Sequence, residues 1–432
     1  MRMNTELTRF TQWVREKPQK RYTALMGLLA AVEGLADSFH RQPSRKAVGV
    51  DGVNKVDYGR RLEANLTDLS ARLRRMGYRP KPSRRVYIPK SNGGSRPIGI
   101  PSFEDRIVED RLSRILQEIW EPEFLECSYG SRPDRNAHQA LARLDHIITK
   151  ERTQWLYEAD LKNFFGSVSH QHLMRFVEHR IGDSNLLRLI RRFLKAGVLE
   201  DGAIYAVEEG TPQGNLVSPV LANIYLHYVL DVWFERRFAK SCRGKAFLVR
   251  YSDDFVVCFE WESDARAFEQ QLKERLKEFS LEVEPSKTAL IRFGDLAPIL
   301  RKRDGLRRAA TFDFLGFTHY MRVRKSGRIQ LSRKTQAAKI RRKLNELGER
   351  LSRLQLKGQR TMQQYVLRHL LGHRGYYGIK GNAKSLKEYF HQAKRVLYRW
   401  LNRRSQRRSF TWERYGQWLN SWYPRPQIVR AL

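Results

Sequence analysis

Apolar side chains recur every three or four residues along several stretches of the chain, which is the pattern of amphipathic helices. Residues 5–36 read as one or two such helices, and residues 103–150 are mostly helical. The pattern is most regular in residues 56–77 and 263–279. In the first of these two stretches the apolar positions are Leu62, Leu66, Leu69 and Leu73. We therefore expect a helix in each of these segments.

Other stretches read as strands, because β-branched and aromatic residues gather there between turn residues. Residues 78–101 resemble a hairpin with an Asn-Gly-Gly turn, residues 246–259 a second hairpin, and residues 281–293 a strand pair. A further strand ends at Asp160 and turns into an aromatic-rich helix. The order strand, helix, two strands, helix, strand is that of a split β-α-β sheet packed on helices. The sequence thus predicts an α+β fold.

The turn of the second hairpin holds two adjacent carboxylates, Asp253 and Asp254. Aspartate is a good turn former, so an exposed turn of this kind needs no function. In the predicted sheet, however, the strand that ends at Asp160 is a neighbour of this hairpin, which brings a third carboxylate close. A core tolerates three clustered carboxylates only when cations neutralise them. The cluster therefore predicts a divalent-metal site.

Two Mg²⁺ ions about 4 Å apart suit in-line phosphoryl transfer, since one activates an attacking hydroxyl and the other stabilises the leaving group. Mg²⁺ keeps water and phosphate oxygens as ligands, so two or three aspartates suffice. We expect Asp160, Asp253 and Asp254 to be catalytic and to hold two Mg²⁺ ions, with Mn²⁺ as a substitute.

Charge is distributed unevenly along the 432 residues. Lys and Arg number 82 against 46 Asp and Glu, and residues 301–432 hold 34 of the basic residues but only 6 of the acidic ones. A polyanionic partner is the simplest explanation, because neutralised phosphates release their counterions. No apolar stretch approaches the roughly 20 residues that span a bilayer. Nucleic acid is therefore a better candidate partner than a membrane.

Cysteine usage indicates the compartment. The chain has three cysteines, with no CxxC motif and no Cys/His cluster. A disulfide framework or a zinc site is therefore not expected. A reducing cytoplasm is the natural compartment for such a chain.

A series of motifs then resembles a known family. The segments ADLKNFF, GTPQGNLVSPVLANIYL, RYSDDF, LEVEPSKT and FLGF occur in this order. Three segments lie before this series: GVDGV, RRVYIPKSNGGSRPIGIP and ECSYGSRPDRNAHQAL. One segment, HRGYYGIKGN, lies after it. Over roughly residues 48 to 415 the chain resembles the reverse transcriptases encoded by bacterial group II introns, or their free-standing relatives.

The resemblance implies a right-hand polymerase with a helical thumb. It divides the chain into an N-terminal extension (1–77), fingers and palm (78–330), a thumb (331–404) and a short C-terminal segment (405–432). The basic loop 39–52 resembles the extension loop that covers the template strand in this group. No endonuclease domain with Cys and His ligands is expected in the C-terminal segment.

The family's nucleotide-binding residues carry over where this sequence matches. Lys90 and Arg96 flank the Asn-Gly-Gly turn and match residues that grip the incoming triphosphate. Phe165 matches the bulky residue that excludes a ribose 2′-hydroxyl, and Gln213 matches a residue of the nucleotide pocket. Lys287 matches a lysine that protonates the leaving pyrophosphate. A core phenylalanine, a turn glutamine and solvated cations remain the plain alternatives.

Two further regions match nucleic-acid contacts of the family. The segment Phe314, Leu315, Gly316 and Phe317 matches the primer grip. Residues 394–408 hold seven basic residues and no acidic one, so one face of this helix can follow a duplex backbone. The expected contacts are Arg395, Arg399, Arg403, Arg404 and Arg407. Tyr398 and Trp400 fit core packing better than base stacking.

The chain departs from the family pattern at three positions. Ser252 stands where YADD has Ala, Ser131 where Phe is usual, and Asn215 where a second Gly is common. None of them removes a catalytic carboxylate. They leave the subgroup, and with it the biological role, open.

Two functions remain from this reading. The first is RNA-directed DNA synthesis, in which a primer is extended with dNTPs on an RNA template and also on a DNA template. The alternative is a maturase that binds a structured group II intron RNA and promotes its splicing, with polymerase activity secondary. The aspartate cluster favours the first, because a module that only binds phosphates gains nothing from clustered carboxylates. Neither function calls for a membrane partner.

Overall fold

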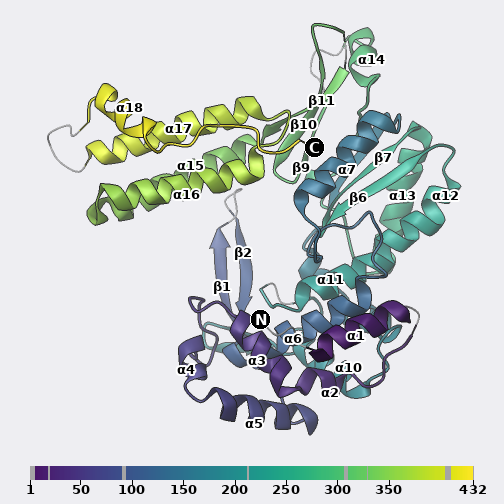
Figure 1. Cartoon of the computed structure of the whole chain (residues 1–432). Helices are drawn as coiled ribbons and strands as arrows, with labels where there is room; N and C mark the ends of the chain where they lie inside the picture. Colours follow the sequence, from purple (N-terminus) through teal and green to yellow (C-terminus); the bar gives the residue numbers. More distant parts are fainter. Residues whose placement is uncertain are drawn as a thin grey trace. The chain divides into compact units, whose positions relative to one another are not determined.

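The computed structural model divides the chain into two compact units (Figure 1). The first comprises residues 1–140, 159–257 and 262–289, and the second comprises residues 141–158, 258–261 and 290–432. The structure describes residues 5–17, 20–89, 94–211, 214–305, 310–327, 329–403 and 410–431. Groups of helices pack beside sheets that contain antiparallel strand pairs, as in an α+β fold, so the predicted fold class is confirmed.

Five helices precede the long, mostly buried helix α6 (Phe103–Trp120), and the first four of them pack against it. They are α1 (Thr5–Glu16), α2 (Met26–Ala30), α3 (Val32–Arg41), α4 (Lys55–Gly59) and α5 (Leu62–Arg74). The single helix predicted over 56–77 is therefore two helices. The backbone leaves the helical region at Arg61, with φ −128° and ψ 46°, after Gly59, a residue that disfavours helix.

A four-stranded sheet in the first unit has the order β2-β1-β4-β5. Its strands are β1 (Ser83–Pro89), β2 (Ser95–Ile100), β4 (Val198–Glu200) and β5 (Ala203–Tyr205). The antiparallel pairing of β1 with β2 runs from Arg84 opposite Ile100 to Pro89 opposite Ser95. This confirms the predicted hairpin in 78–101.

The central sheet has the order β6-β7-β3-β8. Its strands are β3 (Trp155–Asp160), β6 (Ala246–Tyr251), β7 (Asp254–Phe259) and β8 (Ala289–Arg292). The pairing of β3 with β7 is the neighbour relation that the sequence predicts. Helix α13 (Glu262–Glu278) joins β7 to the final strand, also as predicted.

One predicted strand in this region is wrong. Residues 281–284 make only an isolated bridge, between Leu161 and Val283, rather than the first arm of a strand pair. A 3-10 turn, Pro285–Lys287, follows at once, with the Glu284 side chain accepting from the Ser286 amide. Proline at the start of that turn has no amide proton for a ladder, which ends the pairing.

Helices α8 (Phe164–Ser167), α9 (His170–Glu178) and α10 (Ser184–Leu194) follow β3. Helix α11 (Ser218–Leu226) continues through two π-helical turns, His227–Asp231 and Phe234–Phe238, into α12 (Ala239–Ser241). Both π-turns keep the helix going while adding a residue to the turn. Helix α7 (Ala137–Lys150) precedes β3.

The second unit combines a small sheet with a group of long helices. The sheet has the order β11-β10-β9, from β9 (Thr311–Phe314), β10 (Phe317–Val323) and β11 (Ile329–Thr335). The helices are α14 (Ala297–Arg303), α15 (Ala337–Leu354), α16 (Gln359–Tyr377), α17 (Ala383–Asn402) and α18 (Trp412–Asn420). Helices α15, α16 and α17 pack on one another (Figure 1). None of the helices in the described part of the chain has the length and apolar character that crossing a bilayer requires.

Candidate active site

The two adjacent carboxylates lie at the turn between β6 and β7. Ser252 has a φ of 58°, in the left-handed region, so the turn is tight. Burial raises the pKa of the Asp253 carboxyl, and the nearby charge of Asp160 raises it further. The cations of Arg96 and Lys287 act in the opposite direction. Three other predicted site residues therefore lie close enough to influence the Asp253 carboxyl.

Asp160 ends strand β3, and its carboxylate contacts the ammonium of Lys287. Burial alone would lower the pKa of Lys287. The hydrogen bond that its ammonium donates to Asp160 and the charges of Asp160, Asp254 and Glu284 outweigh burial, so the pKa is raised. The Glu284 amide donates to the Asp160 carbonyl at 2.8 Å, which ties the turn that carries Lys287 to the end of β3. Lys287 is thus a protonated cation among carboxylates.

A divalent cation fits the chemistry of this cluster. No group of three or more His, Cys, Asp or Glu side chains within the described ranges is arranged as a ready-made ligand set. A cation already binds Asp160, however, because the Lys287 ammonium contacts its Oδ2. The pKa of the neighbouring, half-buried Asp253 carboxyl is raised by its partial burial first and by the charge of Asp160 second. Carboxylate oxygens are the ligands that Mg²⁺ prefers.

A buried arginine holds the turn from behind. Arg250, on β6, is completely buried, and so is its ion-pair partner Asp231. The Arg250 Nη1 also donates to the Ser252 carbonyl at 2.9 Å. Within the RYSDDF segment, the sequence predicts a role only for the two aspartates. The signal was present, since an arginine inside an apolar strand requires a buried partner.

Phe165 lies on α8 and is half-buried. It lines a pocket of about 260 Å³ with Arg85, Pro97, Gly99 and Thr211 among its other walls. Its carbonyl accepts from the Thr211 amide at 2.6 Å, which fixes the start of the Gly-Thr-Pro-Gln-Gly loop beside it. The position therefore agrees with a pocket wall rather than with the interior of the core.

Gly214 brings the same loop against β2. Its φ is 114°, and an added Cβ would lie 2.2 Å from the Gly99 carbonyl oxygen, so only glycine fits. The next residue, Asn215, is buried and accepts from the Ser83 hydroxyl at 3.3 Å. Asn215 thus has a structural contact that a second glycine could not make. Lys90 and Gln213 lie outside the described residues.

The segment 314–317 is the turn between β9 and β10. Leu315 and Gly316 have φ values of 51° and 82°. Phe314 and Phe317 are buried, so their side chains belong to the core of the second unit. The Tyr376 hydroxyl donates to the Leu315 carbonyl at 2.9 Å. Any contact with a primer would therefore come from the backbone of the turn and from Leu315.

The predicted basic helix is α17. Arg395, Arg399 and Arg403 are exposed and, at intervals of four, share one face of it, whereas Arg404 and Arg407 lie outside the described residues. The guanidinium of Arg403 lies over the Trp400 ring, 5.0 Å from its centre. Tyr398 instead stacks on Trp412 at 4.0 Å, which confirms that this ring serves packing.

The loop predicted over 39–52 begins only at residue 42, because residues 39–41 are the last turn of α3, and it is anchored at both ends. Arg84 donates to the Val48 carbonyl at 3.1 and 2.8 Å, and the Lys55 ammonium donates to the Gln42 carbonyl at 2.6 Å. The residues between these anchors, 43–47, are exposed. The loop thus presents a short basic tip held on a fixed base.

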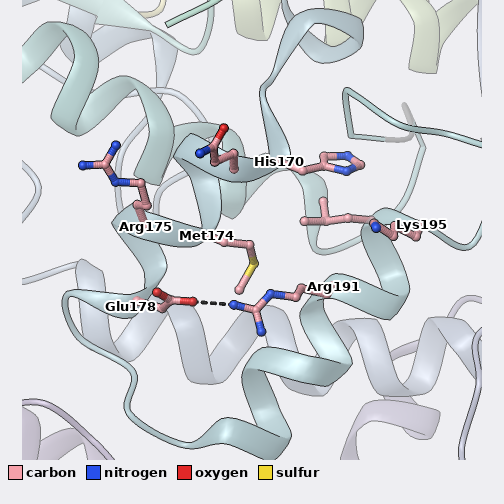
Figure 2. A pocket seen from close by; sticks show the side chains of 8 residues that line it. His170, Met174, Arg175, Glu178, Arg191 and Lys195 are labelled. Carbon is pink, nitrogen blue, oxygen red and sulfur yellow. Dashed lines mark hydrogen bonds and ion pairs between the residues drawn. The ribbon is translucent and has the colours of Figure 1, made fainter.

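A groove of about 350 Å³ between α9 and α10 contains none of the predicted site residues. Figure 2 shows its acidic residue, Glu178, paired with Arg191 at 2.5 Å, and the Met174 side chain pointing into it. With its carboxylate already paired, the groove offers no metal ligand set. The aspartate cluster is therefore the better candidate for an active site.

Comparisons with known proteins agree with this geometry. The family model of the reverse transcriptase (RNA-dependent DNA polymerase) matches residues 88–319. Protein YkfC of Escherichia coli is 38% identical, over 57% of this chain and 72% of its own length. The group II intron-encoded protein LtrA of Lactococcus lactis is 42% identical, over 35% of this chain and 25% of its own.

Two more distant similarities complete the comparison. An uncharacterized 91 kDa protein in the cob intron of Schizosaccharomyces pombe is 40% identical over 36% of this chain and 19% of its own length. A structure of telomerase from Candida albicans reaches a TM-score of 0.44 at 14% identity, over 79% of this chain and 61% of that chain, which is too low to inform the site. The chain thus spans a quarter of LtrA and about a fifth of the cob-intron protein. By the family match and the similarity to YkfC, the chain belongs to the reverse transcriptase family and is of the group II intron-like type.

Proposed function

We propose that this chain extends the 3′-hydroxyl of a DNA primer with dNTPs on an RNA template, and also on a DNA template. One observation carries the proposal. Asp253 is a half-buried carboxyl close to Asp160, and the positive charges of Arg96 and Lys287 lie close enough to act on it. Clustered acids and cations of this kind serve a reaction between a metal-bound hydroxyl and a polyphosphate.

The metals of this reaction would be held by Asp160, Asp253 and Asp254. We propose two Mg²⁺ ions, for which Mn²⁺ can substitute. When bound, such ions lower the pKa of the attacking hydroxyl and neutralise charge on the leaving pyrophosphate. Two or three carboxylates suffice, because substrate phosphates and water complete the coordination.

The remaining residues bind and orient the nucleotide. Arg96, and Lys90 with it, would bind the triphosphate through charge-assisted hydrogen bonds. Lys287 carries a proton at Nζ next to the carboxylates and would deliver it to the leaving pyrophosphate, as a general acid. Phe165 and Gln213 would line the sugar and base side of the pocket.

Nucleic acid would be bound by the exposed arginines of α17, by the 314–317 turn and by the tip of loop 39–52. We divide the chain accordingly into an extension (1–77), fingers and palm (78–330), a thumb (331–404) and a basic C-terminal segment (405–432). The charge of residues 301–432, with 34 basic and 6 acidic side chains, supports a polyanionic partner in this part of the chain.

A second function is favoured by the same charge and by the names of the relatives. LtrA is a group II intron-encoded protein, and other relatives are intron proteins or maturases. We therefore also propose that the chain can bind a structured group II intron RNA. Intron sequence flanking the coding region in the genome would support this role, and its absence would favour a free-standing enzyme.

The proposed activity is tested by incubating the purified chain with a DNA primer annealed to an RNA template. We expect elongation that requires dNTPs, stops when EDTA is added and resumes when Mg²⁺ or Mn²⁺ is restored. Elongation that is unaffected by EDTA would contradict the metal-dependent mechanism. Tight RNA binding without any elongation would leave the maturase function as the better account.

A further inference from the structure

Arg250 is a buried cation in the strand that leads to the catalytic turn. Its side chain and that of Asp231 are both completely buried. A buried charge is tolerated only when it is paired and its hydrogen bonds are satisfied. Arg250 meets this condition fully, which separates it from the exposed arginines of the surface.

All five N–H bonds of the Arg250 guanidinium have an acceptor. Nε and Nη2 donate to the two oxygens of Asp231, at 2.7 and 2.6 Å. Nη2 also donates to the Ser128 hydroxyl at 2.7 Å, and Nη1 donates to the Asn223 side-chain oxygen at 3.1 Å. The fifth bond goes to the Ser252 carbonyl at 2.9 Å. The planar fork therefore cannot shift without breaking several bonds at once.

The backbone of residues 127–130 supports the turn from the other side. The Arg250 amide donates to the Cys127 carbonyl at 2.8 Å, and the Tyr129 amide donates to the Arg250 carbonyl at 2.9 Å. An added Cβ at Gly130 would lie 2.3 Å from the Ser252 amide nitrogen. Asn223 links both sides, because its amide nitrogen donates to the Gly130 carbonyl at 2.7 Å. Ser252 is thus held between Arg250 and Gly130.

The π-turn His227–Asp231 explains how one helix supplies two of these partners. Asn223 and Asp231 are eight positions apart, which on a regular α-helix separates them by about 80° around the axis. A π-turn adds one residue, so the effective separation is seven positions, or about 20°. The π-turn therefore brings the Asn223 amide and the Asp231 carboxylate to the same face of the helix, toward Arg250.

Asp231 also balances a charge. Arg250 lies close enough to Asp253 for their charges to interact. An unpaired cation at that position would compete with a metal ion for the catalytic carboxylates. Because Asp231 neutralises it, Arg250 can hold the turn without adding net positive charge behind the site.

We propose that Arg250 is a positioning residue for the catalytic turn, and that Asp231, set by the π-turn, keeps this support electrically neutral beneath the metal site. The proposal rests on the proposed polymerase function. It assigns to the pair two separable effects: Arg250 fixes the backbone of residues 252–254, and Asp231 maintains their affinity for divalent cations.

The first effect is tested with Arg250→Lys, which keeps the charge but loses the fork. We expect kcat for primer extension to fall about ten- to hundredfold, because a misplacement of about 1 Å is enough for such a loss. KM for dNTP and affinity for the template should change less than about threefold. Arg111→Lys is the matched control, since Arg111 on α6 is also completely buried and donates to the Leu28 carbonyl. It should lower stability while preserving kcat per active site. A loss of kcat no greater than in Arg111→Lys would overturn this part of the proposal.

The second effect is tested with Asp231→Asn. We expect the Mg²⁺ concentration at half-maximal rate to rise about three- to tenfold. Titration of bound Mn²⁺ by electron paramagnetic resonance, on the full chain with template and primer, should show the same loss of affinity. This second readout decides the proposal even if the wild-type chain does not extend primers, so a failure of the proposed function remains distinguishable. Unchanged Mn²⁺ affinity in a folded Asp231→Asn variant would overturn the electrostatic role.

Discussion

At the scale of single residues, the surroundings of Asp253 determine the pKa of its carboxyl and so its competition between protons and metal ions. Its pKa is raised by burial first and by the charge of Asp160 second. A raised pKa means that protons and metal ions compete for the same carboxylate as the pH falls. The carboxyl is ionised above its folded pKa, so we expect activity to be lost on the acidic side.

This competition gives a measurable shift. Primer extension should decline as pH falls from neutrality, and a tenfold higher Mg²⁺ concentration should move the acidic limb of the profile to lower pH. Rates under single-turnover conditions at the two concentrations measure this shift. An acidic limb that does not move with Mg²⁺ would show that a group other than the metal-binding carboxylates limits the rate.

Phe165 is the residue that we expect to select deoxyribonucleotides over ribonucleotides. It is half-buried and lines the pocket beside Gly99 and Thr211. Replacing it by Val would make room for a 2′-hydroxyl, so incorporation of rNTP relative to dNTP should rise about 10- to 100-fold. Phe164→Leu serves as a control, because Phe164 is buried beside it. Single-nucleotide extension with dNTP and rNTP measures the ratio, and an unchanged ratio would make Phe165 a packing residue.

Glu109 is a buried residue that sequence reasoning did not single out. Burial raises the pKa of its carboxyl to about 8, against the opposing bond from the Leu216 amide at 2.8 Å. Below the pKa that Glu109 has in the unfolded chain, the carboxyl is protonated in both the folded and the unfolded state. Its titration then does not lower the free energy of unfolding. Between that value and about 8 the folded state retains a proton that the unfolded state loses, so the contribution to stability is lost as pH rises.

Glu109→Gln removes this titration and keeps an acceptor for the Leu216 amide. We expect the variant to gain about 2 to 4 kcal/mol of stability relative to wild type between pH 5 and pH 8. Chemical unfolding at several pH values measures the difference. The exposed Glu33→Gln is the control and should show no such trend. A constant difference for Glu109→Gln would contradict the raised pKa.

At the scale of elements, regular apolar spacing predicts the bounds of a helix well, whereas local irregularities of the backbone are not predicted. Helix α13 occupies 262–278 against the predicted 263–279, because its apolar spacing is unbroken. The break after Gly59 and the loss of a strand at 281–284 depend on local backbone choices that apolar spacing does not record. The π-turn at 227–231 has no periodic signal of its own, and it is needed to bring Asp231 to Arg250.

The basic face of α17 is also a property of an element. Changing Arg395, Arg399 and Arg403 together to Gln should weaken binding of a template-primer duplex about ten- to hundredfold at moderate salt. The slope of the logarithm of the duplex-binding constant against the logarithm of the salt concentration should become less steep by about 2 to 3. Each phosphate contact contributes about 0.9 to this slope, and the variant loses three arginines. The rate at saturating duplex should change little, since these residues do not contact the carboxylates.

A control of equal charge distinguishes a specific face from net charge. Arg9, Arg15 and Lys17 are exposed at α1 and just after it, and their combined change to Gln removes the same three charges. Fluorescence anisotropy with labelled duplex compares the two triple variants. Equal losses would mean that α17 acts only through the overall charge of the chain.

At the scale of the whole molecule, the sequence predicts which residues lie close together only where the order of strands and helices determines which strands are neighbours. Asp160 and the 253–254 turn could be predicted as neighbours, because the β-α-β order makes β3 and β7 adjacent. The Arg250 network could not, since its partners come from residues 128, 223 and 231 and meet only after folding. The sequence also could not show that the two phenylalanines of the predicted primer grip, Phe314 and Phe317, are buried in the core.

We propose that the half-buried aspartate turn performs metal-dependent DNA synthesis on RNA. The most direct measurement is extension of a DNA primer on an RNA template by wild type and by Asp253→Ala, with Asp68→Ala on the exposed face of α5 as control. We predict that Asp253→Ala loses extension by about a thousandfold or more while template binding is kept, and that Asp68→Ala retains it. Extension by Asp253→Ala at a rate close to that of wild type would contradict the account.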